Sequence, residues 1–276
     1  MIKFFRKLRL DALSRKRFPK YLIYATGEII LVVIGILIAL QINTWNENRK
    51  ESIEEKAILE SLYENLLLAR QQSETLITEE NELKKLLIQI LEADSNNVDR
   101  DSLVITHSVF KAAVWDLQSN QPTFNIYINL KNTNKLSLIK NKDINQKFTD
   151  LEFQLNKLND ILSDRLSVHQ IRIDDVLEND INFIPLVKAN IPEINITNES
   201  QNNYAEVLKN QRIRNLLGMK LTLTQDVIDF RKNLDKEISV LIHLIDSEID
   251  QEYTTKKKMI KLFHYQNRVE HLKKIW

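Results

Sequence analysis

Apolar and polar residues follow two different patterns along this chain of 276 residues. In residues 21–42, YLIYATGEIILVVIGILIALQI, the clearly polar side chains are Thr26, Glu28 and Gln41, and the run 29–40 has no polar face. A helix rises about 1.5 Å per residue, so this stretch spans roughly 33 Å, close to the ~30 Å of a hydrocarbon core. We predict a transmembrane helix over 21–43; a buried core helix is the alternative.

The second pattern begins after the apolar run and has helical spacing. Apolar residues alternate by three and four along a seam interrupted by Ser73 and Glu80. The seam consists of Leu59, Leu62, Leu66, Ala69, Ser73, Leu76, Glu80, Leu83, Leu87 and Ile90. It predicts one long amphipathic helix that continues from the membrane to about Glu92 and packs within its own bundle or against a partner. The two polar residues weaken a coiled-coil interpretation.

Further helices are predicted over 99–118, 123–131, 136–180, 203–217 and 219–251. The two prolines Pro185 and Pro192 predict a loop over 182–203, and Gly218 is placed to cap the helix before it. The expected fold class is therefore all-α, with a single N-terminal transmembrane helix followed by an antiparallel helical bundle of four to six helices. We expect three regions: a basic N-terminus over 1–20, a span over 21–43 and a bundle domain over 44–276.

Composition narrows the possible classes of protein. The chain has three Gly, four Pro and no Cys. So few turn residues argue against sandwiches and doubly wound sheets, and the missing cysteines exclude disulfides, thiolate metal sites and a cysteine nucleophile. A mostly helical protein is what these counts favour.

Charge predicts the orientation of the span. Residues 1–20 contain eight Lys or Arg and one Asp, whereas only Arg49, Lys50 and Lys56 follow soon after the span. The positive-inside rule then places the N-terminus in the cytoplasm and the body outside. No small-x-small cleavage site follows the span, which reads Gln41-Ile42-Asn43, so we expect an uncleaved signal anchor.

Three residues of the span are candidates for helix packing. Glu28 places a costly carboxylate in the apolar run, and Gly35 and Ala39 are small residues one turn apart that permit close approach of a second helix. Their spacing puts them on one face with Val32. A helix–helix seam is one interpretation; the other is a Glu28 side chain that reaches the cytoplasmic headgroups.

Two blocks of sequence resemble a known family. The stretches MIKFFRKLR and GEIILVVIGILIALQINTWNENRK at 27–50 are similar to the start of an uncharacterised bacterial family of single-span membrane proteins. FNIYINLKNTNKLSLIKNKDINQKF at 124–148 resembles its second recurring block, although Asn132-Thr133-Asn134 stands where the family has a Ser-Gly-like turn. The resemblance implies a membrane-anchored helical protein and supplies no catalytic residue.

Other constellations do not reach the pattern of a site. Histidines 107, 169, 243, 264 and 271 lack helical metal-ligand spacing, so we expect no metal and no cofactor. His243, Asp246 and Asp250 share a face, and Asp160 and Asp164 are one turn apart, but each set is better explained as a solvated charged face. The basic and aromatic stretch 256–276 fits a helix that closes the bundle or returns to anionic headgroups. Outside the cytoplasm it would meet no nucleic acid.

These patterns predict a protein of the bacterial inner membrane with a periplasmic body and no enzymatic activity. We expect it to bind a partner protein or sense a ligand at the cell envelope, with the bilayer and either a protein partner or a second copy contacting the span. The alternative is an accessory subunit of an ion-coupled or envelope machine that uses Glu28.

Overall fold

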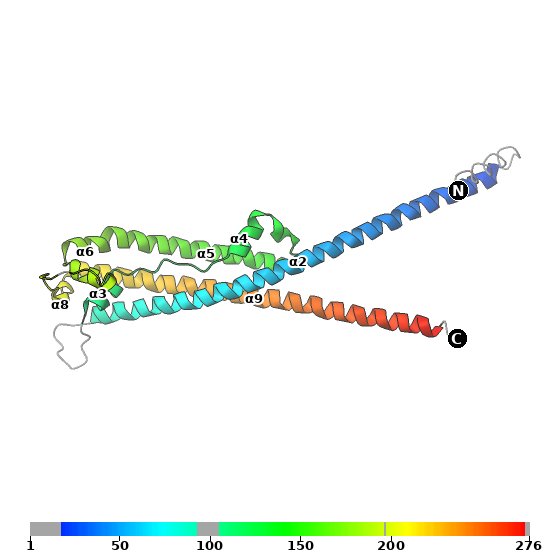
Figure 1. Ribbon diagram of the computed structural model, residues 1–276. Helices are drawn as coiled ribbons and strands as arrows, with labels where there is room; N and C mark the ends of the chain where they lie inside the picture. Colours follow the sequence, from blue (N-terminus) through cyan, green and yellow to red (C-terminus); the bar gives the residue numbers. More distant parts are fainter. Residues whose placement is uncertain (1–17, 93–104, 196, 274–276) are drawn as a thin grey trace. The chain divides into compact units, whose positions relative to one another are not determined.

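The computed structural model describes the backbone of residues 18–92, 105–195 and 197–273, and the side chains of 25–92, 105–188, 191–195 and 197–250. Every regular element within those ranges is helical, and they contain no strand (Figure 1). The elements are α2 (Phe18–Glu92), α3 (His107–Val114), α4 (Asn125–Asn132), the 3-10 helix η1 (Lys135–Leu138), α5 (Lys142–Val168), the π-helical turn η2 (His169–Ile173), α6 (Asp174–Asn179), α7 (Ile184–Asn190), α8 (Tyr204–Val207) and α9 (Gln211–Lys273). The all-α prediction is confirmed.

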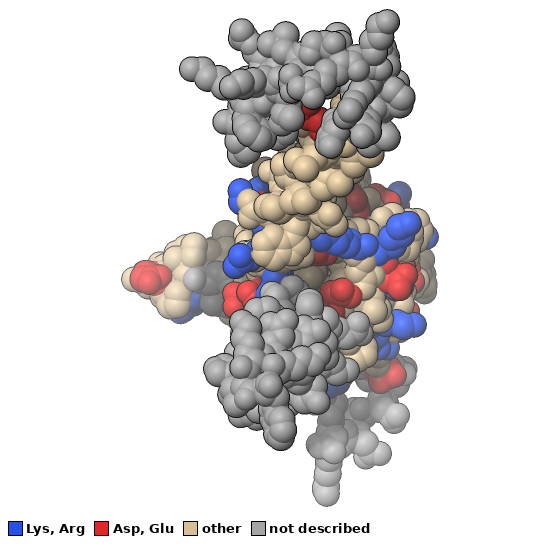
Figure 2. All heavy atoms as spheres, turned by 90° about the vertical axis from the view of Figure 1, so that its right-hand side faces the viewer, with Lys and Arg blue, Asp and Glu red and all other residues tan. Residues whose placement is uncertain are grey.

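The chain separates into two compact units, residues 1–57 and 58–276. In the first unit, the large apolar side chains from Ile29 to Ile42 are 47% to 74% exposed. This part of α2 is long and apolar enough to cross a membrane. In Figure 2 this stretch forms a mostly tan surface.

In the second unit, α9 runs antiparallel to the final part of α2. Lys84 of α2 donates to Gln225 of α9 at 2.6 Å. Arg214, which comes earlier in α9, donates at 2.9 Å to the carbonyl of Leu91, which comes later in α2. Because residue numbers rise along one helix as they fall along the other, the two helices have opposite directions.

Helix α5 also runs antiparallel to α9. Near the start of α5, Lys147 forms an ion pair with Glu237 at 3.1 Å. Further along, Arg165 and Lys220 line the same pocket. Since α2 and α5 are both antiparallel to α9, they are parallel to each other. The predicted antiparallel packing therefore holds for α9 against α2 and for α9 against α5. The chain between α2 and α5 contains α3, α4 and η1, and its segment 115–124 carries no helix.

The second unit contains two apolar clusters, which we call the first and the second core. The first core gathers buried residues of α2, α5 and α9 together with residues near α4. Its members are Ile58, Leu59, Leu62, Leu66, Ala69, Phe124, Tyr127, Ile139, Ile144, Phe148, Leu151, Leu158, Leu162, Val227, Leu234, Ile238, Leu241 and Ile245. The second core consists of Leu83, Leu87, Ile90, Phe110, Ala113, Val114, Ile173, Val176, Leu177, Leu186, Tyr204, Leu208, Ile213, Leu216 and Leu217.

Helix α3 is much shorter than the predicted helix over 99–118, of which residues 99–104 lie outside those described. Thr106 caps the start of α3 by accepting a hydrogen bond from the amide of Val109 at 3.2 Å. Beyond Val114, buried cations occupy the carbonyls that a longer helix would use: Lys220 donates to the carbonyl of Asp116, and Arg165 to that of Gln118. Tertiary contacts thus end the helix before the proline at 122.

Two predicted breaks also differ from the structure. The predicted loop over 182–203 contains α7, because Pro185 occupies a first-turn position where its missing N–H costs no hydrogen bond. Gly218 does not cap a helix but lies inside α9, which begins at Gln211. A glycine costs about 1 kcal/mol inside a helix, and the burial of the neighbouring Leu216 and Leu217 favours the continuous helix against that cost.

The turn between α4 and η1 is built on asparagine rather than glycine. Helix α4 ends at Asn132, and Asn134 adopts a left-handed conformation with φ of 57°. Asparagine tolerates this region better than most residues with a Cβ. A tight turn therefore forms here without glycine.

Candidate functional site

The seam of α2 is buried along its whole predicted length, including its two polar members. Ser73 is 2% exposed and Glu80 is fully buried. The eight apolar members of the seam are buried as well. The spacing of apolar residues therefore predicted this face of α2 correctly, and Glu80 marks a polar position inside it.

Glu80 belongs to a group of buried ionisable residues that we call the charge layer. It consists of Glu80, Arg165, His169, Lys220 and Arg231, all of them buried. On α2 and α5, these residues lie between the stretches that build the first and the second core. On α9, Lys220 follows Leu217 of the second core and Arg231 lies between Val227 and Leu234 of the first. Four of the five residues thus lie between the stretches that build the two cores, and Arg231 lies within the first core.

Two arginines converge on the single carboxylate of Glu80. Arg165 donates from Nη1 to Oε2 at 2.6 Å and from Nη2 to Oε1 at 2.8 Å, a bidentate pair. Arg231 adds a third hydrogen bond from Nη2 to Oε1 at 3.3 Å. Because a buried carboxylate is costly unless it is paired, these bonds tie α2, α5 and α9 together at one level.

The positive charge in the layer exceeds the negative charge. Nε of Arg165 and both Nε and Nη1 of Arg231 are buried without a hydrogen-bond partner. Asp235 lies one helical turn after Arg231 and also has a buried Oδ1 without a hydrogen-bond partner. Burial lowers the pKa of Arg231, whereas the Glu80 charge raises it. The layer is satisfied only in part, which makes it a costly feature for a bundle core.

Lys220 is the most unusual cation of the layer. Its Nζ donates to the carbonyls of Val114 at 2.8 Å and Asp116 at 2.9 Å, at the C-terminal end of α3. A cation is favoured there because the last carbonyls of a helix have no helical partners. Burial, followed by the charge of Arg165, nevertheless lowers the pKa of Lys220 to about 7. This amine gains or loses a proton near neutral pH.

His169 lies next to Lys220, at the point where α5 passes into the π-helical turn η2. Burial lowers its pKa, and the neighbouring charge of Lys220 lowers it further. Its Nδ1 is buried without a partner, its Nε2 is 3.8 Å from Oδ1 of Asp174, and its ring meets Trp115 edge to face. Single π-helical turns are rare and occur frequently at functional sites.

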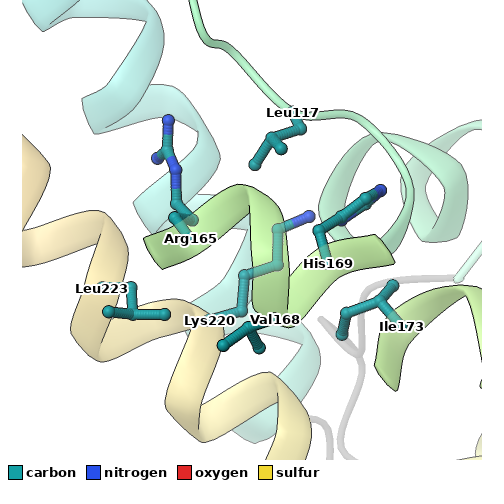
Figure 3. Close-up of a pocket in the computed structure, with 7 residues that line it drawn as sticks. All are labelled: Leu117, Arg165, Val168, His169, Ile173, Lys220 and Leu223. Carbon is teal, nitrogen blue, oxygen red and sulfur yellow. The ribbon is translucent and has the colours of Figure 1, made fainter. Parts of the chain in front are cut away.

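A small pocket lies within the layer (Figure 3). Leu117, Arg165, Val168, His169, Ile173, Lys220 and Leu223 line it, and it has no room for a water molecule. In Figure 3 the ammonium end of Lys220 points toward Leu117 and His169. Two buried bases, Lys220 and His169, and the guanidinium of Arg165 thus meet at one small pocket.

The residues predicted to pack within the span lie apart from this layer, on the exposed part of α2. Glu28, Gly35 and Ala39 are all exposed. A Cβ added to Gly35 would meet no atom within 4 Å. The structure thus leaves their shared face open, and their proposed packing stays a prediction.

The weaker candidates from the sequence are also on the surface. His243, Asp246 and Asp250 are exposed, as are Asp160 and Asp164. Across the part of the chain that the structure describes, no group of three His, Asp or Glu residues is placed to hold a metal ion. Helix α9 continues through most of the basic stretch 256–276, whose side chains lie outside those described.

Sequence reasoning missed four of the five residues of the charge layer. It followed α5 through Leu158, Leu162 and Leu166, but Leu166 is 37% exposed and the buried face continues through Arg165 and His169. On α9, Lys220, Thr224 and Arg231 occupy positions in step with Val227 and Leu234. One signal could have indicated these residues: in each of α2, α5 and α9, a polar residue stands at helical spacing among the apolar residues of the buried face.

Comparison with known proteins gives a limited result. A model of a family of unknown function, DUF6090, matches residues 28–97. The match takes in the apolar run from Glu28 and the whole seam of α2, but not the second resembling block at 124–148. No curated protein and no solved structure matches the chain. The chain is thus similar, over about a quarter of its length, to a family whose function is unknown.

Proposed function

We propose that this chain is a membrane-anchored, non-enzymatic helical protein that carries a bundle domain at the surface of a bilayer. The observation that carries the proposal is the exposed apolar stretch of α2 between Ile29 and Ile42. A contiguous apolar surface of this length is costly in water and favourable in lipid. A helix whose apolar residues occupy every face suits a span rather than the surface of a soluble domain.

Extraction of membranes at alkaline pH tests the anchor. The full chain should stay with the membranes, and a variant lacking residues 21–43 should move to the supernatant. A matched deletion of 182–203, in the body, should leave the chain with the membranes. Release of the full chain under conditions that retain a known integral protein would contradict the proposal.

We further propose the bacterial inner membrane as the location, with the N-terminus in the cytoplasm and the body in the periplasm. The support is the excess of Lys and Arg over residues 1–20 compared with the residues that follow the span. A periplasm-dependent reporter fused after Trp276 should be active, and a cytoplasm-dependent reporter there should be inactive. The reverse result would contradict this orientation and place the body in the cytoplasm.

The bundle is proposed to act by contact with a protein partner rather than by catalysis. The charge layer contains bases and a carboxylate, but the pocket that they line has no room for a substrate. The packing of α2, α5 and α9 around two cores supports a helical bundle as the body of the protein. Crosslinking in native membranes followed by mass spectrometry should recover a second copy or another envelope protein.

Glu28 favours a second candidate function, an accessory subunit of an ion-coupled machine. Its carboxylate is exposed on the apolar stretch, where burial in lipid would be costly without a partner. Glu28→Gln should then abolish ion-dependent activity of the host complex while leaving the chain in the membrane. Unchanged activity would leave Glu28 without an ion-coupled role.

A further inference from the structure

The charge layer combines three features that a plain structural ion pair does not need. Four of its five residues lie between the stretches that build the two cores, it retains buried N–H groups without partners, and it adjoins the π-helical turn η2. Its buried polar groups are therefore satisfied only in part. Regions with few satisfied contacts are where local opening is least costly.

Every element packed around Lys220 presents a charged or titratable group to it. These are Glu80 from α2, Asp116 from the segment after α3, Arg165 from α5 and His169 from η2. Asp174 of α6 faces His169. Arg231 shares Glu80 with Arg165. Of the two carboxylates near Lys220, Asp116 forms an ion pair with Lys111 at 2.7 Å, and Glu80 is shared by Arg165 and Arg231.

We propose that the charge layer is an acid-responsive hinge, at which uptake of protons by Lys220 and His169 releases the end of α3 and the turn η2 from α9. A charged Lys220 and a charged His169 add positive charge beside Arg165 and Arg231, while Glu80 is the fully buried carboxylate available to balance them. Opening at this level lets water reach the surplus charges and relieves their repulsion. The carbonyls of Val114 and Asp116 then lose the lysine that ends α3.

The direction of the response follows from proton linkage. The pKa of Lys220 is about 7 in the closed bundle and returns toward the ordinary lysine value of 10.5 when water reaches the amine. The closed form thus binds fewer protons between those two values, so its stability rises with pH across that window and is lowest below it. The pKa of His169 is also lowered by burial, which adds a penalty in the same direction at acid pH.

Hydrogen exchange on the full-length protein in detergent, corrected for the intrinsic pH dependence of exchange, measures this opening. Between pH 8.5 and pH 6 the open population should rise about thirtyfold if the pKa of Lys220 moves between these two values. The change should concentrate in amides of 165–177 and 218–231, on either side of the layer. Amides of 234–245, in the first core, should change much less.

Substitutions assign the effect to the layer. Lys220→Met keeps the length of the side chain without its charge and should reduce the response to less than threefold. Lys232→Met, at an exposed lysine of the same helix, should keep the full response. His169→Gln should reduce only the part of the response seen at the acid end.

The outcomes separate clearly. A full response in Lys220→Met, or a wild-type response spread evenly over all of α5 and α9, overturns the hinge. So does a wild-type protein that exchanges alike at the two pH values. If Lys220→Met fails to fold, the regional comparison in the wild-type protein decides the question alone.

Discussion

One helix contains two regions of opposite character. In α2, the large apolar side chains from Ile29 to Ile42 are exposed on every face, whereas from Ile58 to Ile90 a single face is buried at helical spacing. The two glutamates differ in the same way: Glu28 is exposed among apolar residues, and Glu80 is fully buried with two arginines. The comparison teaches that a periodic apolar face indicates packing against protein, while an apolar run without a polar face is typical of a membrane span.

The largest expected effect comes from removing the carboxylate of the buried region. Glu80→Ala leaves Arg165 and Arg231 uncompensated and should lower the free energy of unfolding by about 3–5 kcal/mol. Urea denaturation of the full-length protein in detergent, followed by circular dichroism, measures the loss. Glu82→Ala, at an exposed position two residues on, should change stability by less than about 0.5 kcal/mol. If both variants lowered the free energy of unfolding equally, the ion pairs of Glu80 would not stabilise the bundle.

The same substitution, leucine to alanine, can be made in both regions of α2 and its effect on stability compared. Leu62 is fully buried in the first core, so Leu62→Ala should cost about 2–5 kcal/mol in the same denaturation assay. Leu37, which is 58% exposed, has no protein contact to lose, so Leu37→Ala should leave the unfolding of the bundle unchanged. If Leu37→Ala were as costly as Leu62→Ala, the apolar stretch would be packing against protein.

Some of these features could be predicted from the sequence, and others could not. The seam of α2 was predictable in every position because ten residues repeat one spacing. The end of α3 and the continuity of α9 through Gly218 were not, because both depend on contacts with segments distant in sequence. Of the charge layer, the sequence pattern singled out only Glu80. The other members belong to α5, η2 and α9, and a local pattern cannot predict that polar residues of separate helices contact one another.

Replacing Glu80 together with its two arginines tests whether charge balance, rather than shape, determines stability at this level. The triple variant Glu80→Leu, Arg165→Met, Arg231→Met removes the charges together and fills similar space with apolar groups. Such replacements are neutral or stabilising by roughly 1–4 kcal/mol in other proteins, so the triple variant should be at least as stable as the parent. A triple variant as unstable as Glu80→Ala would mean that shape, not charge balance, decides this level of the bundle.

A smaller effect is expected from the packing face of the span. If Glu28, Gly35 and Ala39 form a helix–helix seam, Glu28→Ala and Gly35→Leu should each reduce self-association or partner recovery without preventing membrane insertion. Blue-native electrophoresis and partner pull-down measure this. Ile36→Leu, a conservative change next to Gly35, serves as the control. Unchanged complexes in both variants would reduce the span to an anchor.

The central claim is that the apolar stretch of α2 lies in lipid while the periodic stretch of the same helix lies in a water-exposed bundle. Because the chain has no cysteine, single cysteines can report on each position without background. We expect Glu82→Cys to react with a membrane-impermeant maleimide added outside the inner membrane, and Leu37→Cys to react only after detergent dissolves the membrane. Rapid labelling of Leu37→Cys in intact membranes would contradict the account.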